Sequence, residues 1–335
     1  MAFIYVYEPG THLNYDTGQI IITPPNKQNA RSIPVEQIEG FMLFGRIEIT
    51  GTVLTTCLER GIPVTWLSHR GKYFGRLAST AHVNIDRQRL QFEREQDYDF
   101  RKGIAAKLIS SKITGQRLVL QRLSRKSDDK SITDTIQLLS CYSDKARAAD
   151  SVEQMMGYEG TAAKLYFSAV SGMVPEPFSF SGRSRRPPRD PFNSLLSFAY
   201  TLIFYEMFSQ LENYGLNPYA GFVHTGRADN PALASDMVEE WRSIFADALV
   251  LSLINRNMIK SDQFQTAQNG GVYADKTGSE ILIRAYQKKM DSKVKSFSGS
   301  DESISYRQAF RVQVRSLIKA LDSNNPDLFE TVVYH

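Results

Sequence analysis

Residues 221–242 combine a histidine in a predicted loop with acidic residues on the helix that follows it. His224 lies in the loop, and Asp236 lies three residues before Glu239 and four before Glu240. At these spacings the carboxylates share one helix face and repel each other unless a cation lies between them. The segment alone therefore predicts either half of a metal site or an ordinary acidic helix face beside a loop histidine.

Glu159 is an acidic residue in an unusual helical setting. The predicted helix 151–171 carries Gly157 and Gly160 on either side of it. Each glycine costs a helix about 1 kcal/mol relative to alanine, so close packing or function is expected to retain it. Glu159 would then be an acid on an unobstructed patch of the helix.

Together, Glu159, His224 and Glu239 supply two carboxylates and one imidazole. This donor set suits a hard or borderline divalent ion such as Mg²⁺ or Mn²⁺. The sequence has no cysteine ligand spacing, no HExxH and no Walker loop, and it lacks the Glu-x-x-His pair of di-iron bundles.

Two basic segments point to a polyanionic partner. Segment 101–127 has a helical apolar pattern and eight basic residues but no Asp or Glu, and loop 174–191 is rich in proline and arginine. Phosphate is the natural counter-charge for both, and a basic surface helix and a flexible loop are the alternatives. The predicted DNA contacts are Lys107, Lys112, Arg117, Arg122, Arg183, Arg185, Arg186, Arg189 and Arg242. The combination indicates a metal-dependent enzyme that processes DNA or RNA.

The elements that must position these residues divide the chain into two parts. Residues 1–80 contain short strands separated by turn signals and one short helix, which predicts a small β-rich domain. Residues 81–97 are polar and are interpreted as a linker. From residue 98 to 325 the apolar period becomes about 3.6, which predicts a larger all-helical catalytic domain, and 326–335 form a tail. The expected fold class is α+β.

Composition narrows the class of protein. The 335 residues are 42% hydrophobic and 23% charged, which is typical of a folded protein rather than a disordered one. No apolar run is long enough to cross a membrane, and the N-terminus lacks the features of a signal peptide. Cys57 and Cys141 are expected to be buried thiols of a cytoplasmic protein. The net charge of +4 is modest, so a nucleic-acid site must come from the distribution of charge.

Several motifs, taken together, resemble the CRISPR-associated spacer-acquisition integrase, the universal metal-dependent subunit of the adaptation complex. The resemblance covers essentially the whole chain. It is carried by Phe-Gly-Arg-Ile-Glu-Ile-Thr-Gly at 44–51, Gly-Ile-Pro-Val-Thr-Trp-Leu at 61–67, Glu-Gly-Thr-Ala-Ala-Lys-Leu-Tyr-Phe at 159–167, the arginine-rich loop at 180–191, His224 with Asp-Met-Val-Glu-Glu-Trp-Arg at 236–242, and Gly-Gly-Val-Tyr at 270–273.

The resemblance implies that Glu159, His224 and Glu239 are the catalytic metal ligands. Asp236 is the rival for the third position, or a residue that supports the ligands from behind. Tyr166 is two helical turns after Glu159 and would orient a phosphate or a DNA end, with a core tyrosine as the alternative.

The resemblance also implies a set of partners and a reaction. The N-terminal domain would form a homodimer, and dimers would flank a small ferredoxin-like adaptation protein in a hetero-hexamer. The complex would bind a short duplex DNA fragment and join its 3′-hydroxyl ends to the repeat of a CRISPR array by transesterification. The alternatives are a stand-alone metal-dependent nuclease of branched DNA and a non-catalytic DNA-binding scaffold.

Overall fold

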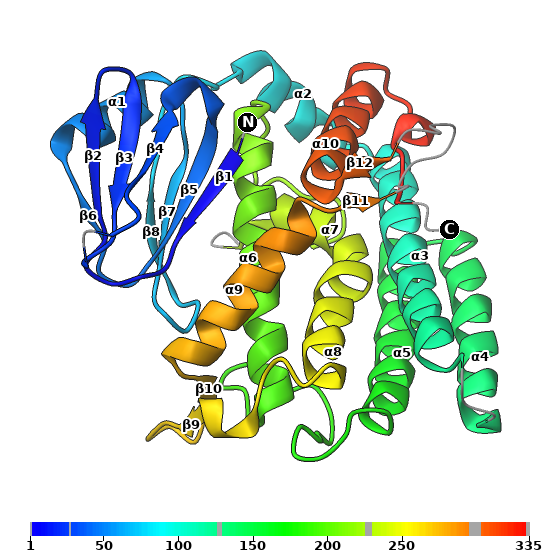
Figure 1. Ribbon diagram of the computed structural model, residues 1–335. Coiled ribbons are helices and arrows are strands. Elements are labelled where there is room, and N and C mark those ends of the chain that lie inside the picture. Colours follow the sequence, from blue (N-terminus) through cyan, green and yellow to red (C-terminus); the bar gives the residue numbers. More distant parts are fainter. Residues whose placement is uncertain (1, 27, 126–128, 225–229, 295–302, 333–335) are drawn as a thin grey trace.

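The computed structural model describes residues 2–26, 28–125, 129–224, 230–294 and 303–332. A strand-rich N-terminal part lies beside a helical C-terminal part, and the long helix α6 runs along the junction (Figure 1). The predicted α+β class is confirmed.

The N-terminal part contains two four-stranded sheets and one α-helix, α1 (Gly51–Glu59). The first sheet has the order β4-β3-β2-β6, with β4 Arg31–Pro34, β3 Gln19–Thr23, β2 His12–Asp16 and β6 Glu48–Ile49. The second has the order β1-β5-β7-β8, with β1 Ala2–Val6, β5 Ile38–Phe44, β7 Val64–Leu67 and β8 Tyr73–Leu77. In the second sheet β1, β5 and β7 are parallel, whereas β7 and β8 form an antiparallel pair.

Strand β5 is buried on both faces, and this ties the two parts of the molecule together. Phe41 and Leu43 belong to the apolar core of the N-terminal part, whereas Met42 and Phe44 belong to the core of the helical part. This alternation follows from the two-residue period of a strand. The Phe44 ring packs against Phe198 on α6, with 6.0 Å between the ring centroids. The second sheet therefore contributes side chains to both apolar cores and is not the outer surface of an independent domain.

The helical part consists of long helices connected by loops and short elements. Its longer helices are α2 (Ile85–Gln96), α3 (Tyr98–Leu123), α4 (Lys130–Arg147), α5 (Val152–Ser171), α6 (Pro191–Asn213), α7 (Ala232–Trp241), α8 (Ala248–Asn255), α9 (Lys276–Met290) and α10 (Tyr306–Asp322). Its short strands are β9 (Phe264–Thr266), β10 (Val272–Ala274), β11 (Lys293–Val294) and β12 (Ile304–Ser305). Helices α3, α4 and α5 pack side by side (Figure 1).

The structure corrects the predicted linker and tail. Most of 81–97 is helix α2, and its fully buried Gln91 donates hydrogen bonds to two backbone carbonyls of the α6–α7 connection, each at 2.8 Å. In the predicted tail, Phe329 is 1% exposed and packs in the helical core. The polar composition of residues 81–97 indicated a connector, but it reflects the solvent-facing side of helix α2.

The helical region that follows His224 is not one continuous α-helix. Residues 242–247 form a π-helical segment between α7 and α8. The Lys289 amino group donates hydrogen bonds to the Ile244 and Phe245 carbonyls of this segment, at 3.3 and 2.7 Å. A π-helical segment displaces carbonyls from their usual partners and often marks a functional site. Here a lysine from another helix satisfies two of them.

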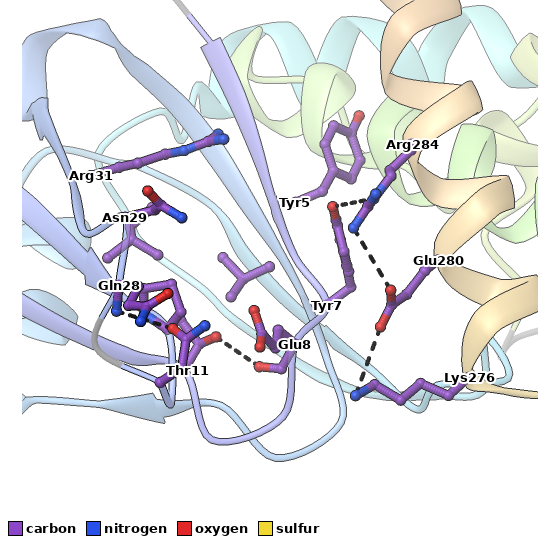
Figure 2. A pocket seen from close by; sticks show the side chains of 14 residues that line it. Tyr5, Tyr7, Glu8, Thr11, Gln28, Asn29, Arg31, Lys276, Glu280 and Arg284 are labelled. Atoms are coloured by element: carbon purple, nitrogen blue, oxygen red, sulfur yellow. Dashed lines mark hydrogen bonds and ion pairs between the residues drawn. The ribbon is translucent and has the colours of Figure 1, made fainter.

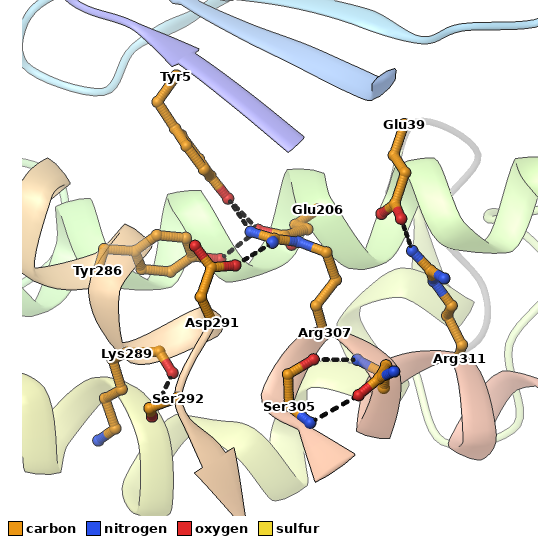
Figure 3. Close-up of polar contacts among 11 residues, drawn as sticks. Tyr5, Glu39, Glu206, Tyr286, Lys289, Asp291, Ser292, Ser305, Arg307 and Arg311 are labelled. Carbon is orange, nitrogen blue, oxygen red and sulfur yellow. Dashed lines mark hydrogen bonds and ion pairs between the residues drawn. The ribbon is translucent and has the colours of Figure 1, made fainter. Parts of the chain in front are cut away.

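A buried polar cluster, formed by Tyr5, Glu206, Tyr286, Asp291 and Arg307, connects β1 with α6, α9 and α10 (Figure 3). The Glu206 carboxylate accepts hydrogen bonds from the Tyr5 hydroxyl, from the Tyr286 hydroxyl at 2.9 Å and from Arg307 Nε at 2.7 Å. Arg307 also pairs with Asp291. We call these five residues the junction cluster, because they fix the orientation of the two parts.

Two expectations about exposure have different outcomes. Cys57 is buried as predicted, but Cys141 is exposed on α4, so the second part of that prediction is wrong. None of the described helices combines the length and the apolar character that a membrane crossing requires.

Candidate metal centre and nucleic-acid interface

The side chains of Glu159 and Glu239 meet around the amino group of Lys112. These residues come from α5, α7 and α3 respectively. Lys112 Nζ lies 2.5 Å from Glu239 Oε2 and also forms an ion pair with Glu159 Oε1. On its other side, Glu239 Oε1 pairs with Arg242 Nη1 at 2.9 Å. Packing of three helices thus places two carboxylates on either side of one cation.

Glu239 is held in its ionised form despite its burial. Burial by itself raises the pKa of a carboxyl group, but Arg242 and Lys112 outweigh this effect and lower the pKa of Glu239 to about 2. Glu239 Oε2 lacks a well-aligned hydrogen bond within the described chain although Lys112 Nζ is nearby. The ion pair is the significant interaction, because charge attraction does not require hydrogen-bond alignment. This oxygen remains available to a stronger cation.

His224 is oriented by Asp236. The Nδ1 atom of His224 lies 2.7 Å from Asp236 Oδ1. Asp236 is fully buried and also accepts the backbone N–H groups of Phe222, Val223 and His224 at 2.6, 2.8 and 3.1 Å. The hydrogen bond to Asp236 raises the pKa of the His224 imidazole, although burial opposes it. The geometry therefore favours Asp236 as the residue that positions His224, with His224 Nε2 as the nitrogen left for a ligand.

The donor chemistry fits a divalent metal, but the side chains are not gathered into a closed coordination shell. In the part of the chain that the structure describes, no group of three or more His, Cys, Asp or Glu side chains is close enough to hold a metal ion. The Lys112 amino group takes the place between the two carboxylates. His224 and Glu239 are connected through α7, because Asp236, which orients His224, lies three residues before Glu239 on that helix. Glu159 is connected to Glu239 through Lys112.

The two glycines beside Glu159 leave open space. A Cβ atom added at Gly157 or at Gly160 would meet no atom outside the helix within 4 Å. Close packing is therefore not the reason for them. They leave the surface around Glu159 unobstructed, which was the other prediction for this helix. A different glycine is required by packing: a Cβ atom at Gly221 would come within 2.7 Å of Asp236 Oδ2.

One predicted DNA contact on α3, Lys107, has structural partners within the chain. Lys107 Nζ donates hydrogen bonds to the Asp327 and Phe329 carbonyls at 2.7 and 3.0 Å, so its amino group is engaged with the main chain. Arg101, from the same basic segment, donates to the Phe222 carbonyl at 3.0 Å. The acid-free pattern of this helix is partly explained by main-chain carbonyls that serve as acceptors.

The remaining predicted DNA contacts of the basic segments differ in exposure. Arg117 is half-buried, Arg122 is exposed and Lys126 lies outside the described residues. In the arginine loop, Arg183 is half-buried, whereas Arg185, Arg186 and Arg189 are exposed. The loop is anchored by Phe180, which stacks on Phe192 of α6 with 4.2 Å between the ring centroids. Its arginines are thus presented from a fixed loop.

Tyr166 is not a DNA contact. Its side chain is fully buried, and its hydroxyl donates a hydrogen bond to Asp247 Oδ2 at 2.9 Å. Tyr200 donates to the other oxygen of Asp247 at 2.6 Å. Burial raises the pKa of Asp247 to about 6. The alternative, a core tyrosine, is therefore correct. The sequence prediction missed Asp247 and Tyr200; the available signal for Asp247 was an acid within an apolar helix.

A cavity of about 470 Å³ lies away from these residues, between the N-terminal part and α9 (Figure 2). Its wall includes Glu8, Arg31, Lys276, Glu280 and Arg284. Arg284 donates a hydrogen bond to the Tyr7 hydroxyl at 2.9 Å. The mixed charges favour no single class of ligand, and none of the predicted site residues lines this cavity.

Comparisons with known proteins agree with the resemblance. A family model described as CRISPR associated protein Cas1 matches residues 4–288. The CRISPR-associated endonuclease Cas1 1 of Chlorobaculum tepidum is 34% identical over 298 residues, which cover 87% of each chain. A chain of a Cas6-RT-Cas1–Cas2 complex has a TM-score of 0.83 and 26% identity, over 98% of this chain and 36% of that chain. A casposase bound to its integration product has a TM-score of 0.81 over 97% of this chain and 92% of that chain, and at 23% identity shows the fold alone.

Proposed function

This chain belongs to the CRISPR-associated Cas1 family, and from that membership we propose that it is a metal-dependent DNA endonuclease and integrase of spacer acquisition. It joins the 3′-hydroxyl ends of a short duplex DNA fragment to the repeat DNA of a CRISPR array by transesterification. The observation that carries this proposal is the pair of carboxylates, Glu159 and Glu239, held around one cation beside an oriented histidine.

Glu159, Glu239 and Nε2 of His224 would hold a Mg²⁺ or Mn²⁺ ion. When bound, this ion supplies polarisation of the scissile phosphate and stabilisation of the leaving 3′-oxyanion. Asp236 keeps the His224 ring in the orientation that directs Nε2 away from it. Arg242 keeps Glu239 anionic, because it pairs with the oxygen that Lys112 does not contact.

Lys112 is the counter-charge that Glu159 and Glu239 share. Its ammonium contacts both carboxylates, where a divalent cation would compete with it for the same oxygens. Two cations cannot share this position without strong repulsion. The Lys112 side chain would therefore leave these oxygens to a bound ion and would then be available to a DNA phosphate.

The partners follow from the same proposal. We assign a homodimer through the N-terminal part and a hetero-hexamer with a small ferredoxin-like adaptation protein. The structural relative named as a Cas1–Cas2 complex supports an adaptation partner of this kind. The exposed arginines at 185, 186 and 189 would contact the backbone of the DNA fragment, since guanidinium groups suit phosphate.

A joining assay tests the function. The full chain, the small partner protein, Mn²⁺, a repeat-containing plasmid and a short duplex with free 3′-hydroxyl ends should give covalent joining of fragment and plasmid. Dideoxy-terminated fragments should abolish it, because the 3′-hydroxyl is the attacking group. Hydrolysis would be indifferent to that block. Product formation that is unchanged with dideoxy ends, or nicking alone, would replace the integrase with a metal-dependent nuclease.

A further inference from the structure

A small cavity opens beside Glu159 and Lys112. Its lining includes Lys112, Glu159, Arg183, Arg185, Arg242 and Asp247. Three of these residues are arginines. They come from the loop before α6 and from the π-helical segment, which are distant in sequence but meet here.

Arg183 forms no ion pair within the described ranges. Its guanidinium donates hydrogen bonds to two neutral groups, the Asn193 side-chain oxygen and the Ser184 carbonyl. Burial lowers the pKa of Arg183 and the charges of Arg185 and Arg242 add to this effect, whereas Tyr200 and Asp247 oppose it. A half-buried guanidinium beside like charges is unfavourable unless an anion joins it.

Unsatisfied polar atoms are concentrated around the same cavity. Nine buried side-chain nitrogen or oxygen atoms in the described chain have no hydrogen-bond partner. Four of these belong to residues that line the cavity: Gln116 Oε1, Arg183 Nε, Arg242 Nε and Ser243 Oγ. Gln116 and Ser243 are 3% and 2% exposed, so solvent contact at their surface does not account for their lack of partners. Buried polar groups are usually satisfied, and a cluster of exceptions indicates a missing partner.

The donors are held in place by their neighbours. Two guanidinium groups lie near the Tyr200 ring, with Arg183 5.2 Å and Arg242 5.1 Å from its centroid. The Tyr200 hydroxyl is fixed by Asp247. Asn193 is fully buried and donates to the Gly182 carbonyl at 2.8 Å, which secures the backbone that carries Arg183. The cavity is thus a prearranged set of donors.

We propose that this cavity is a phosphate subsite that receives a backbone phosphate of the DNA strand whose neighbouring phosphodiester lies at the metal centre. Arg183 and Arg242 donate to the phosphate oxygens, and the Ser243 hydroxyl completes the set of donors. The cavity volume of about 30 Å³ is close to the volume of one water molecule, so one phosphate oxygen enters and the phosphorus lies at the mouth, near Arg185. This subsite rests on the proposed function, because it needs a DNA strand at Glu159.

The test measures binding without catalysis. Fluorescence anisotropy follows a labelled single-stranded 12-nucleotide DNA and the full chain in EDTA, at several NaCl concentrations. Arg183→Gln should weaken binding roughly tenfold, as expected for a charge-assisted hydrogen bond. It should also reduce the steepness of the log–log salt dependence by about 0.7, the value for one lost contact on a single strand. Arg89→Gln removes an exposed arginine of α2 and is the matched control, with binding close to that of the unmodified protein.

A second variant covers the case in which Arg183→Gln disturbs the loop. Ser243→Ala removes a hydroxyl that has no partner in the described structure, so it should leave folding intact, weaken binding about threefold and leave the salt slope unchanged. The subsite is wrong if both variants bind DNA as Arg89→Gln does. It is also wrong if Arg183→Gln leaves DNA binding unchanged and alters only the rise in melting temperature that inorganic phosphate causes, because the site would then bind free phosphate.

The subsite and the proposed function can fail separately. If the unmodified protein joins free 3′-hydroxyl ends and both cavity variants bind normally, the function stands and the subsite falls. If both variants bind weakly as expected but no joining occurs in the dideoxy-controlled assay, the subsite stands as a DNA contact and the integrase assignment falls.

Discussion

Two buried charged clusters of this protein differ in how completely their polar groups are satisfied. In the junction cluster, Glu206 is fully buried, and both of its oxygens accept hydrogen bonds from tyrosine or arginine (Figure 3). Around Glu239, by contrast, one carboxylate oxygen and the Nε atom of Arg242 lack hydrogen-bond partners within the described chain. Both clusters contain glutamate and arginine at ion-pair distance.

The difference separates a structural role from a binding role. A buried network that is complete has nothing left to offer a ligand, so it fixes the orientation of the elements that it joins. A buried network that is incomplete is unfavourable in the free protein and becomes favourable when a ligand supplies the missing partner. The junction cluster therefore contributes to stability, and the cluster around Glu239 fits the binding role proposed for it.

The largest expected effect is on catalysis. Glu159→Gln should reduce joining about 1,000-fold, because loss of a metal ligand removes several kcal/mol of transition-state stabilisation. The melting temperature should change little, because the side chain of Glu159 is 26% exposed. Joining assays and thermal denaturation measure the two quantities. Glu153→Gln changes an exposed acid on the same helix and is the control. An equal loss of joining in both variants would contradict a special role for Glu159.

The opposite pattern is expected at the junction. Glu206→Gln leaves the buried Arg307 without its main counter-charge, which should cost about 3 kcal/mol of unfolding free energy and lower the melting temperature by roughly 10 °C. Joining by the folded protein, assayed well below the transition, should stay within about twofold. Asp291→Asn is the control, because the Asp291 side chain is 54% exposed and its loss should matter little. Loss of joining in folded Glu206→Gln would place the junction in the active site.

An intermediate effect is expected from the residue that orients His224. Asp236→Asn removes the charged partner of the imidazole, which should lower joining by about 10- to 100-fold and raise the Mn²⁺ concentration needed for half-maximal rate. Because Asp236 also accepts three backbone N–H groups, part of the cost should appear as lower thermal stability. An unchanged metal requirement would show that Asp236 serves only the loop.

Lys112 tests whether the metal and the ammonium compete. Lys112→Met should lower the melting temperature in EDTA, because Glu159 and Glu239 lose a shared counter-charge. The same variant should show a larger rise in melting temperature on addition of Mn²⁺ than the unmodified protein, since binding to the native state stabilises it and no ammonium has to be displaced. A smaller rise in the variant would mean that Lys112 helps to bind the metal rather than replacing it.

The smallest effect concerns Lys289, a half-buried lysine outside both clusters. Burial lowers the pKa of Lys289 to about 7, whereas in the unfolded chain it keeps its ordinary value near 10.5. Between these values the unfolded chain binds more protons, so this residue adds stability as the pH rises above about 7 and loses that contribution as the pH falls toward 7, by at most about 1.4 kcal/mol per pH unit.

Comparison of the unmodified protein with Lys289→Met isolates this contribution. Relative to the variant, the unmodified protein should gain stability from pH 7 to pH 9, as measured by chemical denaturation. Parallel pH profiles would show that the Lys289 amine stays charged, with the carbonyls of Ile244 and Phe245 as sufficient partners.

The sequence determined the order and type of the elements and the residues of the candidate site. Apolar periods of two and then about 3.6 gave strands followed by helices, because each period fixes one buried face. Residues 1–80, predicted as short strands with one short helix, contain strands β1 to β8 and helix α1. Residue type and local spacing offered two acids and a histidine as candidates, and the resemblance to the spacer-acquisition integrase implied that they are metal ligands. The structure brings Glu159 and Glu239 to the same lysine and His224 to Asp236.

Only the tertiary structure decided which polar groups face one another. Sequence pattern indicated Lys107 and Lys112 as similar members of one basic row, yet one clamps main-chain carbonyls and the other separates two carboxylates. Tyr166 lies two helical turns after Glu159, but its side chain is in the core, where its hydroxyl donates a hydrogen bond to Asp247. A charged or polar side chain takes its role from the partner that it meets, and partners distant in sequence are brought together by packing, which no local pattern encodes.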